Sequence, residues 1–319
     1  MSPTYPGRPD PAGVTERVPF VSIVVPTRNR APLLADCLRS LTAQSYPAAR
    51  YEVIVVDDGS TDGTGELIRE FAERREPPSI RCIKQNALGL NAARNAGLQA
   101  ALGDPVVFVD DDVDAPAHWL NALAEGSLKY PEAGCLGGPI RLRLEGKTPR
   151  FCGSEPLGET ELDHGEEEAP IRAVWGANMA VRKAAVRQVG PFNEDLKLYG
   201  DEEEWEMRLT ASGGCVMYLP EAWLWHRRIQ DDLRLRRMLR ARLRRGRGHI
   251  RFGRTVGQDF QLRAELLELL AALAHTLRHW CAGGLLHASL RCGRILELLA
   301  DRRPSRLGAR PDEERERNG

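Results

Sequence analysis

Three consecutive aspartates follow an apolar run in VVFVDDDVD, at positions 106–114. Four strand-forming residues lead directly into Asp110, Asp111 and Asp112. Adjacent carboxylates repel one another, and a desolvated carboxylate is costly unless something pairs with it. A D-x-D triplet after a strand can direct two carboxylates to one point, which suits Mg²⁺ or Mn²⁺ bound to a diphosphate. An acidic surface turn would also explain the run, so the triplet alone leaves both interpretations open.

The elements before the aspartates alternate in type. The apolar runs VSIVVP, YEVIVVDD, SIRCIKQ and PVVFVDDD predict strands, and the amphipathic segments between them predict helices. In the first helix, for example, Leu34, Leu38 and Leu41 share one face. This alternation predicts an α/β fold in which helices cover both faces of a parallel sheet.

Ligands of such sheets bind at the carboxyl ends of the strands. All four predicted strand ends are polar, and we expect them to form a common rim around one ligand. The ends read Pro26-Thr27-Arg28-Asn29, Asp57-Asp58-Gly59-Ser60, Gln85-Asn86 and Asp110-Asp111-Asp112.

The regular alternation stops after Tyr130. CLGGPIRLRL predicts one further strand, and the acidic, Gly- and Pro-containing residues 144–170 predict a mobile loop. RAVWGANMAVRKAAVRQVG predicts a strand, a turn and a helix. YGDEEEWEMRLTASG predicts a helix with an acidic start, and CVMYLPEAWLWHRR predicts a strand that ends on His226.

The C-terminal part differs in composition from the rest. Residues 227–254 hold twelve arginines against two aspartates, and two leucine-rich amphipathic helices follow them. We therefore divide the chain into a flexible leader, an α/β domain, an arginine- and leucine-rich helical region and a disordered tail. Their ranges are 1–19, 20–226, 227–301 and 302–319.

Composition sets limits on partners and location. Lys plus Arg and Asp plus Glu both number 45, so net charge indicates no partner. The seven cysteines are odd in number and none form a C-x-x-C pair. This pattern predicts reduced, buried thiols and a cytoplasmic location, and it argues against a disulfide framework or a zinc site. No apolar run reaches eighteen residues, so we expect no transmembrane helix.

Several motifs in order resemble one family. VSIVVPTRNR, YEVIVVDDGSTDGT, KQNALGLNAARNAGL, VVFVDDDVD, VWGANMAVRKAAVRQVGPFNE and YGDEEEWEMRL resemble a family 2 glycosyltransferase, over about residues 20–226. The resemblance implies a GT-A fold, a Rossmann-like nucleotide-sugar-binding sheet, here followed by a helical appendage. It implies metal-dependent transfer of a sugar from a nucleotide-sugar donor, with a UDP-sugar and inversion expected. The acceptor would be a hydroxyl of a saccharide, a lipid-linked molecule or another compound.

The resemblance also implies a donor site. Its nucleotide-sugar-binding residues would be Pro26, Thr27, Arg28, Asp57, Asp58, Asn86, Gly89, Arg94, Asp110 and Asp111. Either Asp57 or Asp58 would read the base edge, and the Arg94 guanidinium suits phosphate oxygens. Asp111, the middle residue of the triplet, is expected to face outward.

Asp112 would bind Mg²⁺ or Mn²⁺, with His226 as a second ligand. A buried histidine that satisfies a backbone group is the alternative for His226. In this family the metal neutralises charge on the departing nucleoside diphosphate, which is Lewis-acid catalysis.

The acceptor side needs a general base. The family usually reads Glu-Asp at the start of the acidic helix, whereas this chain reads Asp201-Glu202. Aligning Gly200 and the downstream RL places Glu202 at the position of the base, with Asp201 beside it. The residues expected to shape the acceptor pocket are Trp175, Gly176, Asn178 and Trp205, although Trp175 could equally be core.

Other functions stay open at this point. A retaining GT-A enzyme shares the nucleotide half, a nucleotidyltransferase would release pyrophosphate from a nucleoside triphosphate, and a protein with a dead site would only bind nucleotide sugars. A dinucleotide dehydrogenase is disfavoured because no G-x-G-x-x-G follows the first strand.

The arginine-rich region has two interpretations. No aromatic residues are interleaved at base-stacking spacing, so we expect no nucleic-acid partner. Together with the amphipathic helices, the arginines suit peripheral attachment to an anionic membrane surface at the cytoplasmic face. A self-packed helical subdomain is the alternative.

Overall fold

The computed structural model describes residues 18–74, 76–153, 161–197 and 199–300. The chain divides into two compact units, which we describe separately. The sheet unit comprises Met1–Arg141, Thr160–Phe192 and Trp205–His226, and the helical unit comprises Leu142–Glu159, Asn193–Glu204 and Arg227–Gly319. The predicted leader and tail lie outside the described residues, except for Val18 and Pro19 of the leader.

An eight-stranded sheet with the order β3-β2-β1-β4-β9-β6-β10-β8 forms the centre of the sheet unit. Its strands are β1 (Val21–Thr27), β2 (Tyr51–Asp57), β3 (Ser79–Lys84), β4 (Val106–Val109), β6 (Ala133–Gly137), β8 (Ala169–Ile171), β9 (Asn178–Val181) and β10 (Cys215–Tyr218). The first four strands of the chain are parallel, as expected. Strand β9 runs antiparallel to both β4 and β6, so the whole sheet is mixed.

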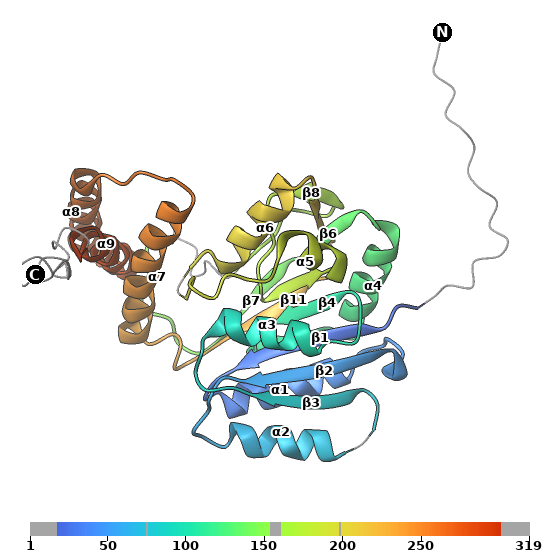
Figure 1. The fold of residues 1–319 in the computed structure, drawn as a ribbon. Helices are drawn as coiled ribbons and strands as arrows, with labels where there is room; N and C mark the ends of the chain where they lie inside the picture. The colour runs from blue at the N-terminus through green and yellow to red at the C-terminus, as the bar shows by residue number, and fades with distance from the viewer. Residues whose placement is uncertain (1–17, 75, 154–160, 198, 301–319) are drawn as a thin grey trace, which may run out of the picture. The chain divides into compact units, whose positions relative to one another are not determined.

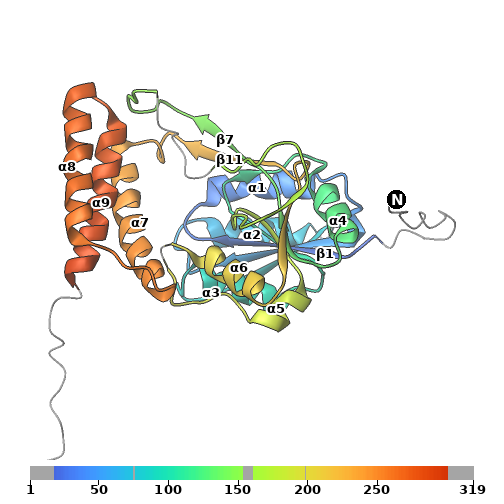
Figure 2. The same cartoon turned by 90° about the horizontal axis from the view of Figure 1, so that it is seen from above.

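Helices cover both faces of this sheet, which confirms the layered α/β prediction. In Figure 2, α1 (Ala31–Thr42), α2 (Thr64–Glu73) and α4 (Trp119–Lys129) lie on one face, and α3 (Leu90–Ala100) and α5 (Lys183–Val189) lie on the other. Every residue of β1 and β2 is buried, because both strands are covered on both faces. Strand β3 lies at the edge of the sheet and is largely exposed.

Two predicted strands are each broken in two. CLGGPIRLRL forms β6 and then β7 (Ile140–Glu145), because the chain turns at Gly138. A Cβ at Gly138 would lie 2.3 Å from the carbonyl oxygen of Ala222, so the backbones are in close contact there. The segment before His226 likewise forms β10 and then β11 (Leu224–Ile229). Strand β11 pairs antiparallel with the short β5 (Val113–Asp114) and places His226 opposite Val113.

Three helices make up most of the helical unit (Figure 1): α7 (Leu235–Thr255), α8 (Leu262–His279) and α9 (Ala282–Ala300). They match the predicted arginine-rich and leucine-rich segments, although the first residues of the arginine-rich stretch belong to β11. Helix α6 (Asp201–Ala211) begins in this unit and ends in the sheet unit. None of the helices among the described residues is both long enough and apolar enough to cross a membrane.

Close glycine contacts and ion pairs join α7 and α9. A Cβ at Gly246 or at Gly293 would lie 2.1 Å from a carbonyl oxygen of the facing helix, so α7 and α9 cross with their backbones in contact. The Glu297 carboxylate pairs with Arg247 at 2.8 Å and with Arg251 at 2.7 Å. Two arginines of α7, themselves 41% and 50% exposed, therefore pair with a buried carboxylate of α9.

Candidate functional site

The aspartate triplet and His226 meet in the sheet unit. Strand β4 ends at Val109, and Asp110–Asp112 form the turn that leads into β5. Because β5 pairs with β11, His226 Nε2 lies 2.8 Å from Asp112 Oδ1 and 3.9 Å from Asp110 Oδ2. The three side chains offer ligand atoms that all lie within 4.8 Å of one another.

This cluster fits a divalent cation. Asp112 is 2% exposed and His226 is 5% exposed, whereas Asp110 reaches the surface. The Nδ1 atom of His226 is buried and forms no hydrogen bond with the described residues, whereas Nε2 faces the Asp112 carboxylate. Carboxylate oxygens with one imidazole nitrogen form a donor set that suits Mn²⁺ or Mg²⁺.

Asp111 does not face outward, so that expectation is wrong. Its side chain is buried, accepts a hydrogen bond from Thr27 Oγ1 at 2.7 Å and lies 3.2 Å from Arg30 Nε. The chain turns directly after β4, so the alternation of a strand does not continue through the triplet. Burial raises the pKa of Asp111 to about 7, against the opposing effect of the Arg30 guanidinium.

The negative charge of the triplet extends to its surroundings. Burial, and then the carboxylates of Asp111, Asp112 and Asp110, raise the pKa of the Cys37 thiol well above its usual value. Arg30 offsets part of this charge, because its guanidinium also donates to Asp112 Oδ2 at 2.7 Å. The site is therefore a cluster of negative charge with one arginine bound to it.

The loops after β2 and β3 are held together by Asp58. Its carboxylate accepts hydrogen bonds from the amide of Leu88 at 2.7 Å, from the amide of Gly89 at 3.1 Å and from Gln85 Nε2 at 2.6 Å. Asp57 accepts the amide of Ser60 at 2.9 Å within its own turn. Both acids are buried, so each orders a loop at the carboxyl edge of the sheet.

The other predicted donor-site residues differ in exposure. Pro26 and Thr27 are buried at the end of β1, while Arg28 and Asn86 are exposed. Gly89, with φ of 107°, precedes α3 in a conformation that side chains rarely adopt. Their contact with a nucleotide sugar stays a prediction.

Arg94 is buried and lies against Gly176, which belongs to the predicted acceptor pocket. A Cβ on Gly176 would lie 2.0 Å from an Arg94 guanidinium nitrogen, so only glycine admits this contact. Arg94 also donates to Asn91 Oδ1 at 3.3 Å. The structure thus brings together two residues that the sequence assigned to different parts of the site.

Asn178 and Trp205 lie in the core. Asn178 accepts from Trp119 Nε1 at 2.9 Å and donates to Ala222 O at 2.7 Å. Trp205 donates from Nε1 to Gly190 O at 2.9 Å and is fully buried. These contacts explain both residues as structural, so their predicted place in an acceptor pocket gains no support. Trp175 is half-buried against the core.

The acidic helix start is formed as predicted. Helix α6 begins at Asp201 and carries four acidic residues in its first turn. Asp201 and Glu202 are partly exposed there, and the amide of Glu204 bonds to Gly200 O at 2.9 Å. Glu202 as the base and Asp201 beside it stay predictions.

The sequence profile described as glycosyl transferase family 2 matches residues 22–190, which is more than half of the chain. The chain belongs to glycosyl transferase family 2.

Relatives of this family 2 glycosyltransferase support the assignment. Glycosyltransferase AglE of Haloferax volcanii is 30% identical over 206 residues, covering 64% of this chain and 66% of its own length. A validoxylamine A glucosyltransferase of Streptomyces hygroscopicus subsp. jinggangensis is 30% identical over 239 residues, covering 66% and 56%. The matches thus span between about half and two thirds of the length of these relatives.

Solved structures establish that the fold is GT-A. Mannosyltransferase PcManGT from Pyrobaculum calidifontis, solved with GDP-Man and Mn²⁺, matches with a TM-score of 0.62 at 20% identity, over 89% of this chain and 88% of its own. Residues 1–349 of TarS from S. aureus match with a TM-score of 0.52 at 18% identity, over 88% and 91%. GalNAc-T7, solved with UDP, GalNAc and Mn²⁺, gives a TM-score of 0.56 at 18% identity, over 68% and 44%.

Arg30 is a residue of the site that the sequence did not predict. Arg30 stands two residues after the predicted Arg28 in VVPTRNR, yet Arg30 contacts Asp111 and Asp112 while Arg28 is exposed. The usable signal was that an acidic triplet needs a nearby cation. That signal does not indicate whether Arg28 or Arg30 supplies the positive charge.

Proposed function

We propose that the chain transfers a sugar from a nucleotide-sugar donor to an acceptor hydroxyl, with Mg²⁺ or Mn²⁺ held by Asp110, Asp112 and His226. The observation that carries this proposal is the cluster of those three side chains at the carboxyl end of β4. Membership of the family supports the reaction class, and the Mn²⁺ in two neighbours of the same fold supports the choice of metal.

When bound, the metal would supply positive charge to the diphosphate of the donor. The chain's own residues fix where that charge sits. Asp112 is held between Arg30 and His226, so its carboxylate cannot rotate freely toward solvent. Asp111, held by Thr27 and Arg30, stiffens the turn that carries Asp112. The ligands are thereby ordered before a donor arrives, which lowers the entropy cost of binding.

The donor is proposed to be a UDP-sugar that lies along the ends of β1, β2 and β3. Asp58 supports this role because it orders the segment Leu88–Gly89 directly before α3. Because of these contacts, the edge of the nucleotide base would have to compete with the backbone amides of Leu88 and Gly89 for the Asp58 carboxylate. Asp57, whose carboxylate accepts the amide of Ser60 within its own turn, is the second acid available to the base.

Inversion is proposed because the helix start offers a base for a single displacement. Glu202 would accept the proton of the attacking hydroxyl, and the N-terminal end of α6 favours ionised carboxylates. A retaining reaction is the alternative, and the anomeric configuration of the product separates the two.

Peripheral binding to an anionic membrane is proposed for the helical unit. Arg236, Arg240 and Arg244 recur at four-residue spacing on α7, line a pocket of about 590 Å³ and form no ion pair with the described residues. Helix α8 exposes an apolar stripe, which Trp280 directly after the helix extends. The leucines of the stripe are between 40% and 79% exposed, and Trp280 is 81% exposed. The stripe consists of Leu266, Leu267, Leu270, Leu273, Leu277 and Trp280.

The metal site is tested with Asp112→Asn. This substitution keeps the size of the side chain and removes its charge, so Mn²⁺-dependent binding of UDP and sugar transfer should fall together. Calorimetric titration of UDP, with and without Mn²⁺, and UDP release from a panel of UDP-sugars and GDP-mannose measure the two quantities. The matched control is Asp36→Asn, because Asp36 is an exposed aspartate of α1 that pairs with Arg39.

Asp36→Asn should behave as wild type in both assays. Thermal unfolding of both variants checks that Asp112→Asn still folds. Full activity in excess EDTA, or metal-dependent UDP binding that survives in a folded Asp112→Asn variant, would show that the cluster is not the metal site.

A further inference from the structure

A second group of metal-binding side chains lies in the helical unit. It consists of Cys152, His275 on α8 and Cys281 directly before α9. Cys152 Sγ lies 3.4 Å from His275 Nε2, and Cys281 Sγ accepts the amide N–H of Cys152 at 3.2 Å. The three ligand atoms all lie within 4.8 Å of one another.

The fold holds these residues at this spacing. Gly284 allows α9 to approach α8 closely, because a Cβ there would lie 2.3 Å from Thr276 Oγ1, one residue after His275. The amide of Ala282 donates to Arg150 O at 2.8 Å and so ties the chain before Cys152 to the start of α9. The sulfur of Cys281 is therefore set between a loop and a helix that are both fixed by other contacts.

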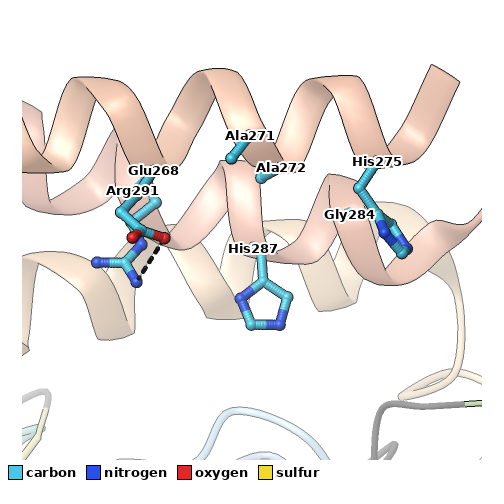
Figure 3. Close-up of a pocket in the computed structure, with 7 residues that line it drawn as sticks. All are labelled: Glu268, Ala271, Ala272, His275, Gly284, His287 and Arg291. Atoms are coloured by element: carbon cyan, nitrogen blue, oxygen red, sulfur yellow. Dashed lines mark ion pairs between the residues drawn. The ribbon is translucent and has the colours of Figure 1, made fainter. Parts of the chain in front are cut away.

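The cluster can be reached from solvent. Cys152 is exposed, while Cys281 is buried. His275 also lines a pocket of about 180 Å³ between α8 and α9. Figure 3 shows His275 and Gly284 at one end of this pocket, His287 nearer the middle and the Glu268–Arg291 ion pair at the other end. An ion can enter from the surface and still find a buried ligand.

The ligand types and distances select zinc. Two thiolates and an imidazole form a soft donor set, unlike the carboxylates beside β4. Zn–S bonds of about 2.3 Å and Zn–N bonds of about 2.0–2.1 Å at tetrahedral angles place sulfur and nitrogen about 3.6 Å apart. The observed 3.4 Å between Cys152 Sγ and His275 Nε2 is close to that value.

We propose that the helical unit binds one Zn²⁺ through Cys152, His275 and Cys281, with water in the fourth position. The ion would cross-link the segment that carries Cys152 to α8 through His275 and to the start of α9 through Cys281. This proposal reverses the expectation from cysteine spacing, which argued against a zinc site. The ligands stand at positions 152, 275 and 281, so no short motif marks the site.

The test uses untagged full-length protein, purified with a phosphine reductant and without chelator. We expect about one equivalent of zinc per chain by elemental analysis. Replacement by Co²⁺ should give a thiolate-to-cobalt charge-transfer band in the near ultraviolet and intense visible bands of a tetrahedral site. Cys152→Ser and His275→Gln should lose the zinc and weaken the charge-transfer band.

Two control variants separate this site from other sources of metal. Cys82→Ser removes another exposed cysteine, on β3, and should keep the zinc. Asp112→Asn removes the carboxylate of the proposed Mn²⁺ site and should also keep it. A strong chelator should lower the Tm of wild type and of Cys82→Ser, and leave that of Cys152→Ser unchanged.

Three results would overturn the proposal. The first is protein that takes up no zinc when supplied with an equimolar amount under reducing conditions. The second is zinc that remains in folded Cys152→Ser and His275→Gln variants. The third is a Cys152–Cys281 disulfide that forms in air and resists the reductant, because the cysteines would then serve as a cross-link.

Discussion

At the residue scale, the three aspartates coexist because each has a different environment. Asp111 is buried with Thr27 and Arg30, Asp112 lies between Arg30 and His226, and Asp110 reaches solvent. Arg30 thus offsets part of the charge that opposes burial of these carboxylates. It does so on the side of Asp112 away from His226, because the two partners contact different carboxylate oxygens.

The general base is tested at this same scale. Glu202→Gln keeps the size of the side chain and cannot accept a proton, so turnover should fall by about 10²–10⁴-fold, the usual effect of a positioned base. Affinity for UDP with Mn²⁺ should not change, because it depends on the strand ends and the aspartate cluster. Steady-state kinetics and titration of UDP measure the two effects separately.

Asp201→Asn is the matched control, since it removes the neighbouring charge from the same helix turn. Asp201→Asn should reduce turnover less than Glu202→Gln does, and it should leave the affinity for UDP unchanged. An inactive Asp201→Asn beside a nearly normal Glu202→Gln would mean that the reversed Asp-Glu order has moved the base by one residue.

At the element scale, backbone contacts decide what the side chains can do. The pairing of β5 with β11 is short, yet it places His226 opposite Val113, directly after the turn that carries Asp112. In the helical unit, the crossing of α7 and α9 depends on Gly246 and Gly293. Each glycine sets the distance between these two helices.

Gly246→Ala should therefore destabilise the helical unit. Alanine favours a helix over glycine by up to about 1 kcal/mol. Here, however, its Cβ would lie 2.1 Å from Leu290 O, so the helices must separate. Overpacking of this kind typically costs about 1–3 kcal/mol, and we expect a net loss. Thermal unfolding followed by circular dichroism measures it.

Gly63→Ala is the control, because Gly63 precedes α2 and has no heavy atom within 4 Å of its added Cβ. Its Tm should stay near that of wild type. If Gly246→Ala proved as stable as Gly63→Ala, or more stable, the close crossing of α7 and α9 would be contradicted.

At the scale of the whole molecule, two units of different character share one chain. The sheet unit carries the family 2 site, and the helical unit carries arginines, exposed leucines and the Cys–His cluster. Internal pairing accounts for some of the arginines, such as Arg247 and Arg251 with Glu297. No ion pair within the described residues accounts for the row at Arg236, Arg240 and Arg244, so membrane binding stays a proposal that rests on these residues.

Membrane binding is tested with vesicles of phosphatidylglycerol and phosphatidylcholine. Full-length protein should co-sediment with them at low salt and less so near 0.15 M salt, where the Debye length is about 8 Å. A basic residue near an anionic surface contributes about 1 kcal/mol, so Arg240→Gln should weaken partitioning about fivefold. Leu270→Asp should also weaken it, because it places a charge in the apolar stripe.

Arg187→Gln serves as the matched control, since it removes one exposed arginine from α5 of the sheet unit. Its partitioning should equal that of wild type. Protein that never co-sediments with these vesicles at low salt would rule out the anchor. Equal losses for Arg187→Gln and Arg240→Gln would indicate a diffuse charge effect and no defined surface.

The sequence by itself determined the layered α/β fold, the four polar strand ends and the family. These follow from local patterns, because strand burial, helix amphipathicity and turn residues are encoded over a few neighbouring positions. It also predicted Asp112 and His226 as partners through the resemblance. Tertiary structure decided what depends on pairing between distant segments. It buried Asp111 beside Arg30, set Arg94 against Gly176, and joined Cys152 to His275 and Cys281. No local pattern could give those contacts, because each one depends on how strands and helices far apart in the chain are brought together.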